Sequence, residues 1–305
     1  RWLVGPVEAR AFHVAVWHSH VTLAMVFLIL APWTKLTHVL ALPVALRYRR
    51  PAKEKNHLED APGQRAKGTA TLSDLPLAAH LEVDACMYCG RCRKQCPISI
   101  SGIPFAPETL LQEEKRLLHT VAWKKPLLGT VITEDALWSC TACRSCEERC
   151  PMGGDLVARI VDIRRSVATS GKLFEPVAKR FKEAAEVSRQ PAGGGIGSMA
   201  PESIYIWPGC HTKNEKGSGI LKALLRLIIH AGLSPVVLEP PRCCAGPDRL
   251  LGNEAFFVEA VQANLAYLKP FDGMLVVTPC PHCYTTLKYE YPVNVTLKHH
   301  VHFLQ

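Results

Sequence analysis

The sequence lacks charge over one long stretch near its start. From Ala11 to Trp33 there is no Asp, Glu, Lys or Arg. About 20 apolar residues are enough for a helix to cross the hydrocarbon core of a bilayer, so this stretch predicts a transmembrane helix. A signal peptide would need a basic start, a shorter apolar core and a small-residue cleavage site, a pattern that does not fit here. The basic cluster from Arg47 to Arg50 places the residues after the helix on the cytoplasmic side, by the positive-inside rule.

The sequence also lacks the pattern of a disulfide-linked secreted protein, although it contains 13 cysteines. Most of them stand in short C-x-x-C repeats, which are typical of metal ligation in a reducing compartment. The cysteine-rich part is therefore expected to be cytoplasmic. The formal charge of +9 omits ionised thiolates and the negative charge of bound clusters, so it does not indicate nucleic-acid binding.

Eight of the cysteines form two runs, 86–96 and 140–150, that share the spacing C-x2-C-x2-C-x3-C-P. This spacing is typical of bacterial ferredoxins with two 4Fe-4S clusters, in which the fourth cysteine of each run ligates the other cluster. Zinc knuckles are the alternative, but a duplicated 2-2-3 spacing followed by proline suits 4Fe-4S clusters far better. We expect one cluster on Cys86, Cys89, Cys92 and Cys150, and the other on Cys96, Cys140, Cys143 and Cys146.

From about residue 202 the pattern changes to short apolar runs that alternate with helical stretches. Runs at 204–206, 236–238 and 274–277, with helical stretches near 217–231 and 253–268, predict an α/β domain with a parallel sheet. Each run is soon followed by cysteine, and the carboxyl ends of parallel strands converge where such folds bind cofactors. The alternative is a set of buried structural cysteines. The cysteines that follow the three runs are Cys210, Cys243, Cys244, Cys280 and Cys283.

Shifts in composition divide the chain into five segments. We expect a membrane helix with a cytoplasmic extension over 1–50, a linker over 51–79, a mostly helical two-cluster ferredoxin-type domain over 80–189, a glycine-rich linker over 190–201 and an α/β cysteine-rich domain over 202–305. The two-cluster domain should contain a helix over 107–118. A second helix after the second run should bury Leu156 and Ile160 and leave Arg164 and Arg165 largely outside its apolar face.

The cysteine spacing of the last domain resembles the CCG domain of heterodisulfide reductase catalytic subunits and their relatives. Cys210 is followed after 32 residues by the Cys243-Cys244 pair, and after 35 more by Cys280. The resemblance implies that the five cysteines hold a noncubane 4Fe-4S cluster. The glycine usual after the pair is Ala245 here. Some relatives use the domain only as a scaffold, so a noncubane cluster, a cubane cluster and no cluster remain open.

Two histidines accompany the uncharged stretch. His20 and His38 are 18 residues apart, which is five turns of a continuous helix, so on such a helix both would face one side. The residues from His20 to His38, followed by Leu42-Pro43-Val44, resemble the last helix of the respiratory nitrate reductase gamma subunit family. That resemblance implies that the two histidines are axial ligands of b haems whose other ligands come from an earlier helix. The alternative is histidines packed in a bundle or at the membrane interface.

The order of these parts resembles the membrane-bound iron–sulfur oxidoreductases, which include electron-transfer flavoprotein:menaquinone oxidoreductases and heterodisulfide reductases. The sequence after Cys280, with Gly252-Asn253-Glu254 and His299-His300, looks most like the flavoprotein:menaquinone group. The resemblance implies an inner-membrane subunit that takes electrons from a soluble carrier such as electron-transfer flavoprotein and passes them through the clusters and b haem to menaquinone. The sequence opens at Arg1 without a methionine, and it stops at Gln305 before the second CCG-like repeat that relatives usually carry. Both ends are therefore expected to be incomplete.

Two other functions fit the same residues. The CCG cluster could be catalytic and reductively cleave a disulfide with electrons from quinol, or the chain could be a relay subunit of a larger respiratory complex. No catalytic residue, donor, acceptor or direction of electron flow follows from the sequence. Basic residues between the predicted ligands could dock an acidic carrier, although a solvated basic face is the simpler interpretation. They are Arg91, Arg93, Lys94, Arg144 and Arg149.

Overall fold

The computed structural model describes residues 6–31, 34, 36–48, 67–188, 203–239 and 242–305. These residues form two compact units, one built from the chain up to residue 48 and from 71–156, the other from 67–70 and 157–305. The linker predicted over 190–201, and most of the one predicted over 51–79, lie outside the described residues.

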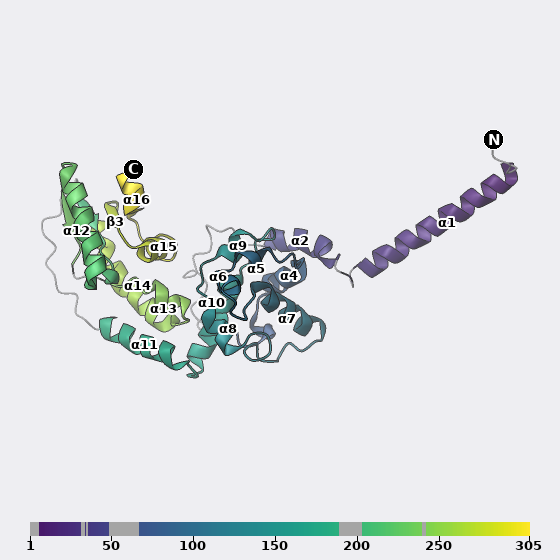
Figure 1. Ribbon diagram of the computed structural model, residues 1–305, viewed down its shortest axis with the longest axis horizontal. Helices are drawn as coiled ribbons and strands as arrows, with labels where there is room; N and C mark the ends of the chain where they lie inside the picture. The colour runs from purple at the N-terminus through teal and green to yellow at the C-terminus, as the bar shows by residue number, and fades with distance from the viewer. Residues whose placement is uncertain (1–5, 32–33, 35, 49–66, 189–202, 240–241) are drawn as a thin grey trace. The chain divides into compact units, whose positions relative to one another are not determined.

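Two helices open the chain, α1 (Pro6–Leu30) and α2 (Thr37–Tyr48) (Figure 1). α1 ends ahead of Pro32 in the sequence, because proline disfavours helical backbone in the residue before it. Within the described residues, Ala9–Leu30 is the one helical segment long and apolar enough to cross a membrane, judged by length and composition. Trp33, the expected end of the span, lies outside the described residues.

Short helices surround the two cysteine runs in the first unit. They are η3 (Leu72–Asp74), α4 (Leu77–Ala85), α5 (Arg91–Gln95), α6 (Pro97–Ile100), α7 (Pro107–His119), α8 (Glu134–Ser139) and α9 (Ser145–Glu148). α7 confirms the helix predicted for 107–118 and buries Leu110, Leu111 and Leu117, which are spaced to share one face. α2 packs against α4, so the segment after the long apolar helix is part of this unit.

The second unit contains a four-stranded sheet with the order β2-β1-β3-β4, in which every pairing is parallel. The strands are β1 (Ile204–Ile206), β2 (Pro235–Val237), β3 (Leu275–Thr278) and β4 (Thr296–His299). The first three confirm the predicted runs to within a residue. β4 was not predicted, because its exposed and half-buried residues give no apolar run at this edge of the sheet.

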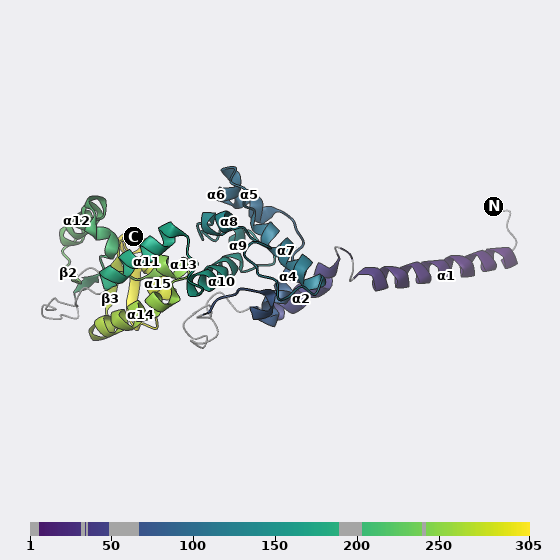
Figure 2. The ribbon, with the colours of Figure 1, turned by 90° about the horizontal axis from the view of Figure 1, so that it is seen from below.

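Helices cover both faces of this sheet (Figures 1 and 2). They are α12 (Glu215–His230), α13 (Gly246–Leu250), α14 (Glu254–Leu268), α15 (Pro281–Tyr289) and α16 (His300–Leu304), with the short turns η4 (Cys210–Lys213) and η5 (Lys269–Phe271). Successive strand residues point to opposite faces, so Tyr205 packs with α14 while Ile204 and Ile206 pack with α12.

Two further helices, α10 (Leu156–Thr169) and α11 (Glu175–Ser188), pack against this α/β domain. The expectation that Arg164 and Arg165 lie outside the buried face of α10 is wrong, since they are only 2% and 4% exposed. Arg164 Nη1 donates to the Leu250 carbonyl at 2.9 Å, and Arg165 Nε lies 2.9 Å from Glu254 Oε2. Buried guanidinium groups need such partners, and partners supplied from 86 and 89 residues away cannot be found by helical periodicity.

Candidate iron–sulfur sites

The two ferredoxin-type runs form loops of the same local geometry. Cys86 ends α4 and Cys140 ends α8, and each is followed by two residues of positive φ before the next short helix. These are Tyr88 (52°) and Gly90 (70°) in the first loop, and Ala142 (54°) and Arg144 (63°) in the second. Three of the four are not glycine, and such residues rarely adopt this conformation away from functional sites. The duplicated sequence thus folds into two copies of one turn.

In the first unit, Cys86 lies close to the last cysteine of the other run. Burial raises the pKa of the Cys86 thiol, and the neighbouring Cys150 and Cys89 raise it further. Cys86 and Cys150 also pack at the margin of one small core, around Ala45 of α2, Ala85 of α4 and Met152. Cys86 of the first run therefore lies beside Cys150 of the second, and their ligation of one cluster stays a prediction.

Cys92 has a partner that the spacing did not indicate. Its thiol donates to Glu108 Oε2 at 3.6 Å, and Glu108 also pairs with Arg93. Burial, with the adjacent carboxylate, raises the pKa of Cys92 to about 12. Glu108 is 6% exposed at the start of α7, and a single Glu in the first turn of a helix gives no signal of this contact.

The second run faces the first, because α5 packs against α9. Burial raises the pKa of Cys146 to about 12, and Glu147, Cys140, Cys143 and Cys92 of the other run contribute. Cys96 is buried at the start of α6. The five basic residues between the ligands are all exposed, and Arg93 and Arg144 pair with Glu108 and Glu147.

The five cysteines of the second unit gather at the carboxyl edge of its sheet. Cys210 follows β1, Cys243 and Cys244 follow β2, and Cys280 and Cys283 begin α15 after β3. Each strand ends at this edge because all pairings are parallel, so residues about 30 to 40 positions apart in sequence become neighbours. The chain thus has the arrangement that the spacing predicted.

Direct contacts join these five side chains. The Cys243 thiol donates a hydrogen bond to the Cys210 sulfur. This contact lowers the pKa of Cys210 to about 7 and raises the pKa of Cys243. The Cys283 thiol lies within hydrogen-bonding reach of both Cys244 and Cys280, which raises its own pKa and lowers that of Cys280 to about 5. Cys280 also lies near Cys210, so the contacts run through the whole set.

The surroundings of these cysteines fit a bound cluster. Gly209 has a φ of 75°, and a Cβ at this position would stand 3.0 Å from Cys283 Sγ and 3.2 Å from His211 Nδ1. Glycine therefore keeps open the space in front of the thiols. The buried Trp207 Nε1 and His211 Nδ1 have no hydrogen-bond partner among the described residues. Polar nitrogens of this kind suit an anionic group with sulfur acceptors.

No three His, Cys, Asp or Glu side chains in the described residues converge as ligands of a single metal ion. The thiolates of an iron–sulfur cluster bind different irons rather than one ion, so they need not converge in that way.

Two residues outside the motif hold the backbone of the Cys243-Cys244 pair. Asn264 Nδ2, on α14, donates to the Cys243 carbonyl at 2.9 Å and lies 3.0 Å from the Tyr291 hydroxyl. That hydroxyl donates to the Cys244 carbonyl at 3.0 Å. Both side chains are buried, at 2% and 3% exposure. The sequence signal was weak, an asparagine flanked by Ala263 and Leu265 in a stretch that also contains Glu259 and Gln262.

Replacing Asn264 with Leu is expected to lower the occupancy of the CCG site, because the Cys243 carbonyl and the Tyr291 hydroxyl would lose a buried partner. Such a loss costs about 1–3 kcal/mol. Iron analysis and EPR of the purified chain should show fewer irons with unchanged ferredoxin-type signals. Gln262→Leu removes an amide from an exposed position of the same helix and serves as the control. Equal iron content in Asn264→Leu and wild type would contradict the prediction.

The departure from the CCG pattern falls at a strained backbone position. Ala245 takes a left-handed conformation, with a φ of 55°, and is fully buried. Glycine adopts this conformation freely, whereas a residue with a Cβ is strained in it. This explains why glycine is usual there. Gly246 is required for another reason, since a Cβ would stand 2.1 Å from Thr286 Oγ1.

Ala245→Gly is therefore expected to raise the free energy of unfolding by about 1 kcal/mol, the scale of left-handed strain. Gly246→Ala, at the next position, should lower the free energy of unfolding because Thr286 is buried and must move. Thermal unfolding of the three proteins in one detergent checks both signs. A lower unfolding midpoint for Ala245→Gly than for wild type would refute the strain argument.

The two predicted haem histidines lie on different helices. His20 is on α1 and His38 is on α2, whereas the five-turn argument assumed one continuous helix. The assumption of one continuous helix is wrong for this chain, because α1 ends at Leu30 and α2 begins at Thr37. Their shared face therefore does not follow from the spacing.

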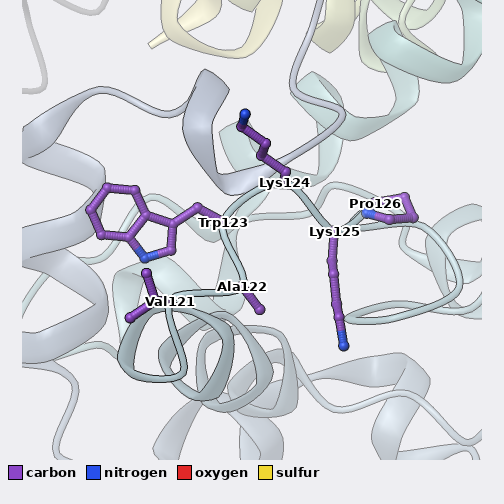
Figure 3. A pocket seen from close by; sticks show the side chains of 6 residues that line it. All are labelled: Val121, Ala122, Trp123, Lys124, Lys125 and Pro126. Carbon is purple, nitrogen blue, oxygen red and sulfur yellow. The ribbon is translucent and has the colours of Figure 1, made fainter.

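A pocket of about 510 Å³ lies elsewhere, in the loop between α7 and α8 (Figure 3). It is lined by Val121, Ala122, Trp123, Lys124, Lys125 and Pro126. None of the predicted ligands lines it.

Comparison with known proteins agrees with both cysteine modules. Residues 82–154 match the family model of a 4Fe-4S dicluster domain, and residues 204–288 match that of the cysteine-rich CCG domain. No solved structure matches the chain.

Three curated relatives cover different parts of the chain. The EtfAB:quinone oxidoreductase of Syntrophomonas wolfei is 27% identical over 92% of this chain and 47% of its own length. A protein described as a probable membrane-anchored ferredoxin, from Chromohalobacter salexigens, is 28% identical over 69% of this chain and 38% of its own. One component of a ferredoxin:CoB-CoM heterodisulfide reductase from Methanosarcina mazei is 34% identical over 35% of this chain and 58% of its own.

The chain spans less than half the length of the first two of these relatives. It carries a dicluster domain and a cysteine-rich domain in that order, and its sequence is similar to proteins named for oxidoreductase activity. The chain thus carries the two cysteine modules, a 4Fe-4S dicluster domain and a CCG domain, and is similar to proteins named as iron–sulfur oxidoreductases.

Proposed function

We propose that the chain relays electrons at the cytoplasmic membrane between a soluble donor, such as electron-transfer flavoprotein, and the menaquinone pool. The observation that carries the proposal is the packing of α2 against Cys86 and Cys150. α2 follows the apolar helix α1, so the membrane end of the chain and one predicted set of cluster ligands meet in one small core. The name of the Syntrophomonas relative, an EtfAB:quinone oxidoreductase, supports this donor and a quinone acceptor.

The proposal assigns thirteen cysteines to three clusters. When bound, the clusters supply one-electron carriers whose potentials depend on their surroundings. The chain's part is to hold the thiolates and fix their spacing. The first set is Cys86, Cys89, Cys92 and Cys150, the second is Cys96, Cys140, Cys143 and Cys146, and the noncubane set is Cys210, Cys243, Cys244, Cys280 and Cys283.

α1 is proposed as the membrane anchor. Its 25 residues give a length of about 37 Å, enough for a hydrocarbon core of about 30 Å. Its side chains are exposed along the helix, including Phe12, Trp17 and Leu28. The resemblance to nitrate reductase gamma subunits supports His20 and His38 as axial ligands of b haem, with the iron–sulfur domains on the cytoplasmic side. The name of the Chromohalobacter relative, a probable membrane-anchored ferredoxin, supports a membrane anchor for this chain.

The packing of α2 supports an order for the proposed route. Ala41, Leu42 and Ala45 lie against the core that includes Cys86 and Cys150, so the cluster on the first set is the one nearest the membrane segment within this unit. Electrons that enter at the second set would leave through the first.

The test uses the full chain in detergent with its clusters assembled. About twelve irons per chain, with EPR signals from three clusters, are expected, together with reduction of a menaquinone analogue by reduced electron-transfer flavoprotein. Fewer than about eight irons in intact protein would refute even the two ferredoxin-type clusters. A chain with all clusters and no quinone reduction would leave the relay-subunit alternative.

Disulfide reduction at the CCG cluster is the second candidate. The gathering of five cysteines at one edge of the sheet, with an open space kept by Gly209, is the observation in its favour. Cleavage of a disulfide by the quinol-reduced chain would establish it, and intact disulfides beside active quinone reduction would exclude it.

A further inference from the structure

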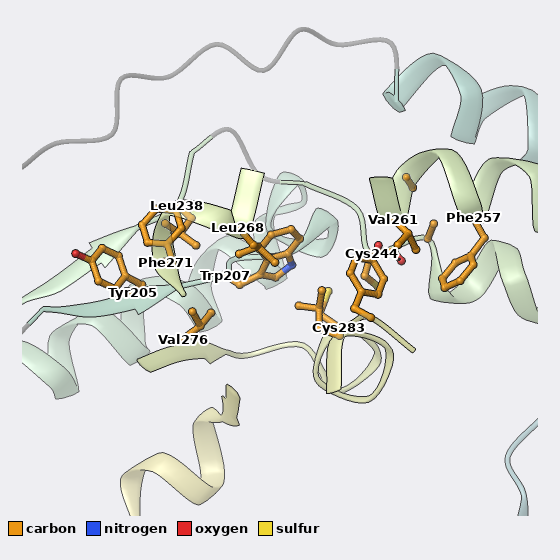
Figure 4. Close-up of a cluster of buried hydrophobic side chains, with 14 of the residues drawn as sticks. Tyr205, Trp207, Leu238, Cys244, Phe257, Val261, Leu268, Phe271, Val276 and Cys283 are labelled. Carbon is orange, nitrogen blue, oxygen red and sulfur yellow. Dashed lines mark hydrogen bonds between the residues drawn. The ribbon is translucent and has the colours of Figure 1, made fainter. Parts of the chain in front are cut away.

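Trp207 is held rigidly beside the cysteines of the CCG domain. It follows β1, and its backbone N–H donates to the Val277 carbonyl at 2.9 Å, which continues the pairing with β3. Strand alternation turns Trp207 to the same face as Tyr205, into the core that contains Cys244 and Cys283 (Figure 4). The indole is 1% exposed and packs edge-on against Tyr267 at 6.2 Å between ring centroids. Its position is therefore fixed on several sides.

The indole nitrogen lacks a partner. Nε1 is buried, and no atom of the described residues accepts its hydrogen bond. An indole N–H can only donate, so this position has no alternative role as an acceptor. The neighbouring Tyr267 hydroxyl already donates to the Glu239 carbonyl at 3.0 Å. Figure 4 shows the nitrogen on the edge of the ring that faces Cys283. A buried donor aimed at a site implies an acceptor there when the site is filled.

We propose that Trp207 Nε1 donates a hydrogen bond to a sulfur atom of the cluster held by the five CCG cysteines and thereby raises its reduction potential. The inference rests on the proposed function, because it requires that cluster to be bound. A hydrogen bond to sulfur stabilises the reduced form more than the oxidised form, since the reduced cluster carries the greater negative charge. Trp207 is thus a positioning and tuning residue, with the thiolates as the ligands.

The test is a redox titration of the full chain followed by EPR. Trp207→Phe keeps an aromatic ring in the core, removes the donor and reduces the volume of the side chain. Its CCG cluster is expected at wild-type occupancy and with a more negative midpoint potential, while the ferredoxin-type clusters titrate as in wild type. Tyr267→Phe is the matched control, because it changes the aromatic neighbour of Trp207 without removing the indole N–H. A Trp207→Phe midpoint equal to that of wild type would overturn the proposal.

A second measurement does not depend on a variant that folds. Wild-type chain labelled with 15N in the indole of tryptophan is expected to show a nitrogen hyperfine coupling on the pulsed EPR signal of the CCG cluster. A CCG signal without that coupling would overturn the role of Trp207 and leave the proposed function intact. A wild-type chain that holds only about eight irons and no third signal would overturn both.

Discussion

Cys150→Ala is expected to remove the same cluster as Cys86→Ala, and not the cluster lost in Cys140→Ala. The reason is that Cys150 belongs to the second run in sequence but lies with Cys86 in the structure, in the core around Ala45. Each variant should lose about four irons per chain, the content of one cluster. The EPR spectra of Cys150→Ala and Cys86→Ala should match. The expected effect is large because no other side chain replaces a thiolate on its iron.

Cys96→Ala provides the reciprocal control. It should match Cys140→Ala, since the fourth cysteine of the first run is assigned to the second cluster. Spectra in which Cys150→Ala matches Cys140→Ala, and Cys96→Ala matches Cys86→Ala, would mean that each run holds its own cluster. Loss of both clusters in every variant would show instead that the two sites assemble together, and iron content would then be about eight lower than in wild type.

Arg165→Ala is expected to destabilise the second unit by about 3–5 kcal/mol, the scale for removing one partner of a buried ion pair. The Arg165 side chain is 5% exposed and pairs with Asp162 of its own helix and with Glu254 at the start of α14. Without it, Glu254, whose side chain is 14% exposed, would lose its closer guanidinium partner and keep only Arg249 at 3.5 Å. The unfolding midpoint of the variant in detergent, compared with wild type, measures the effect.

Arg116→Ala is the matched control for that variant. Arg116 also pairs with a glutamate, at 2.7 Å to Glu113, but its side chain is 53% exposed on α7. An exposed pair of this kind contributes about 0–1 kcal/mol. Equal effects of the two substitutions would contradict the view that burial gives the α10 contact its importance.

The contact between α10 and the CCG domain also uses a glycine. Gly252 has a φ of 91°, and a Cβ there would stand 2.7 Å from the Arg164 backbone. Asn253 then caps α14, with its side chain accepting from the Phe256 N–H, and Glu254 pairs with Arg165. Of the three residues Gly252-Asn253-Glu254, which carry part of the family resemblance, the first and the last therefore contact α10, and Asn253 begins α14 between them.

The sequence by itself determined the two duplicated cysteine turns, the parallel α/β domain and the position of five cysteines at one edge of its sheet. These follow from local spacing, since a C-x2-C-x2-C loop and a short apolar strand are set by residues near one another in the chain. Only the tertiary structure decided which residues from distant parts of the sequence contact these cysteines and helices. Glu108 beside Cys92, Asn264 and Tyr291 beneath Cys243-Cys244, and the buried Arg165 all depend on partners brought in by packing. His20 and His38 likewise lie on two separate helices, α1 and α2, which a helical period counted along the sequence did not indicate.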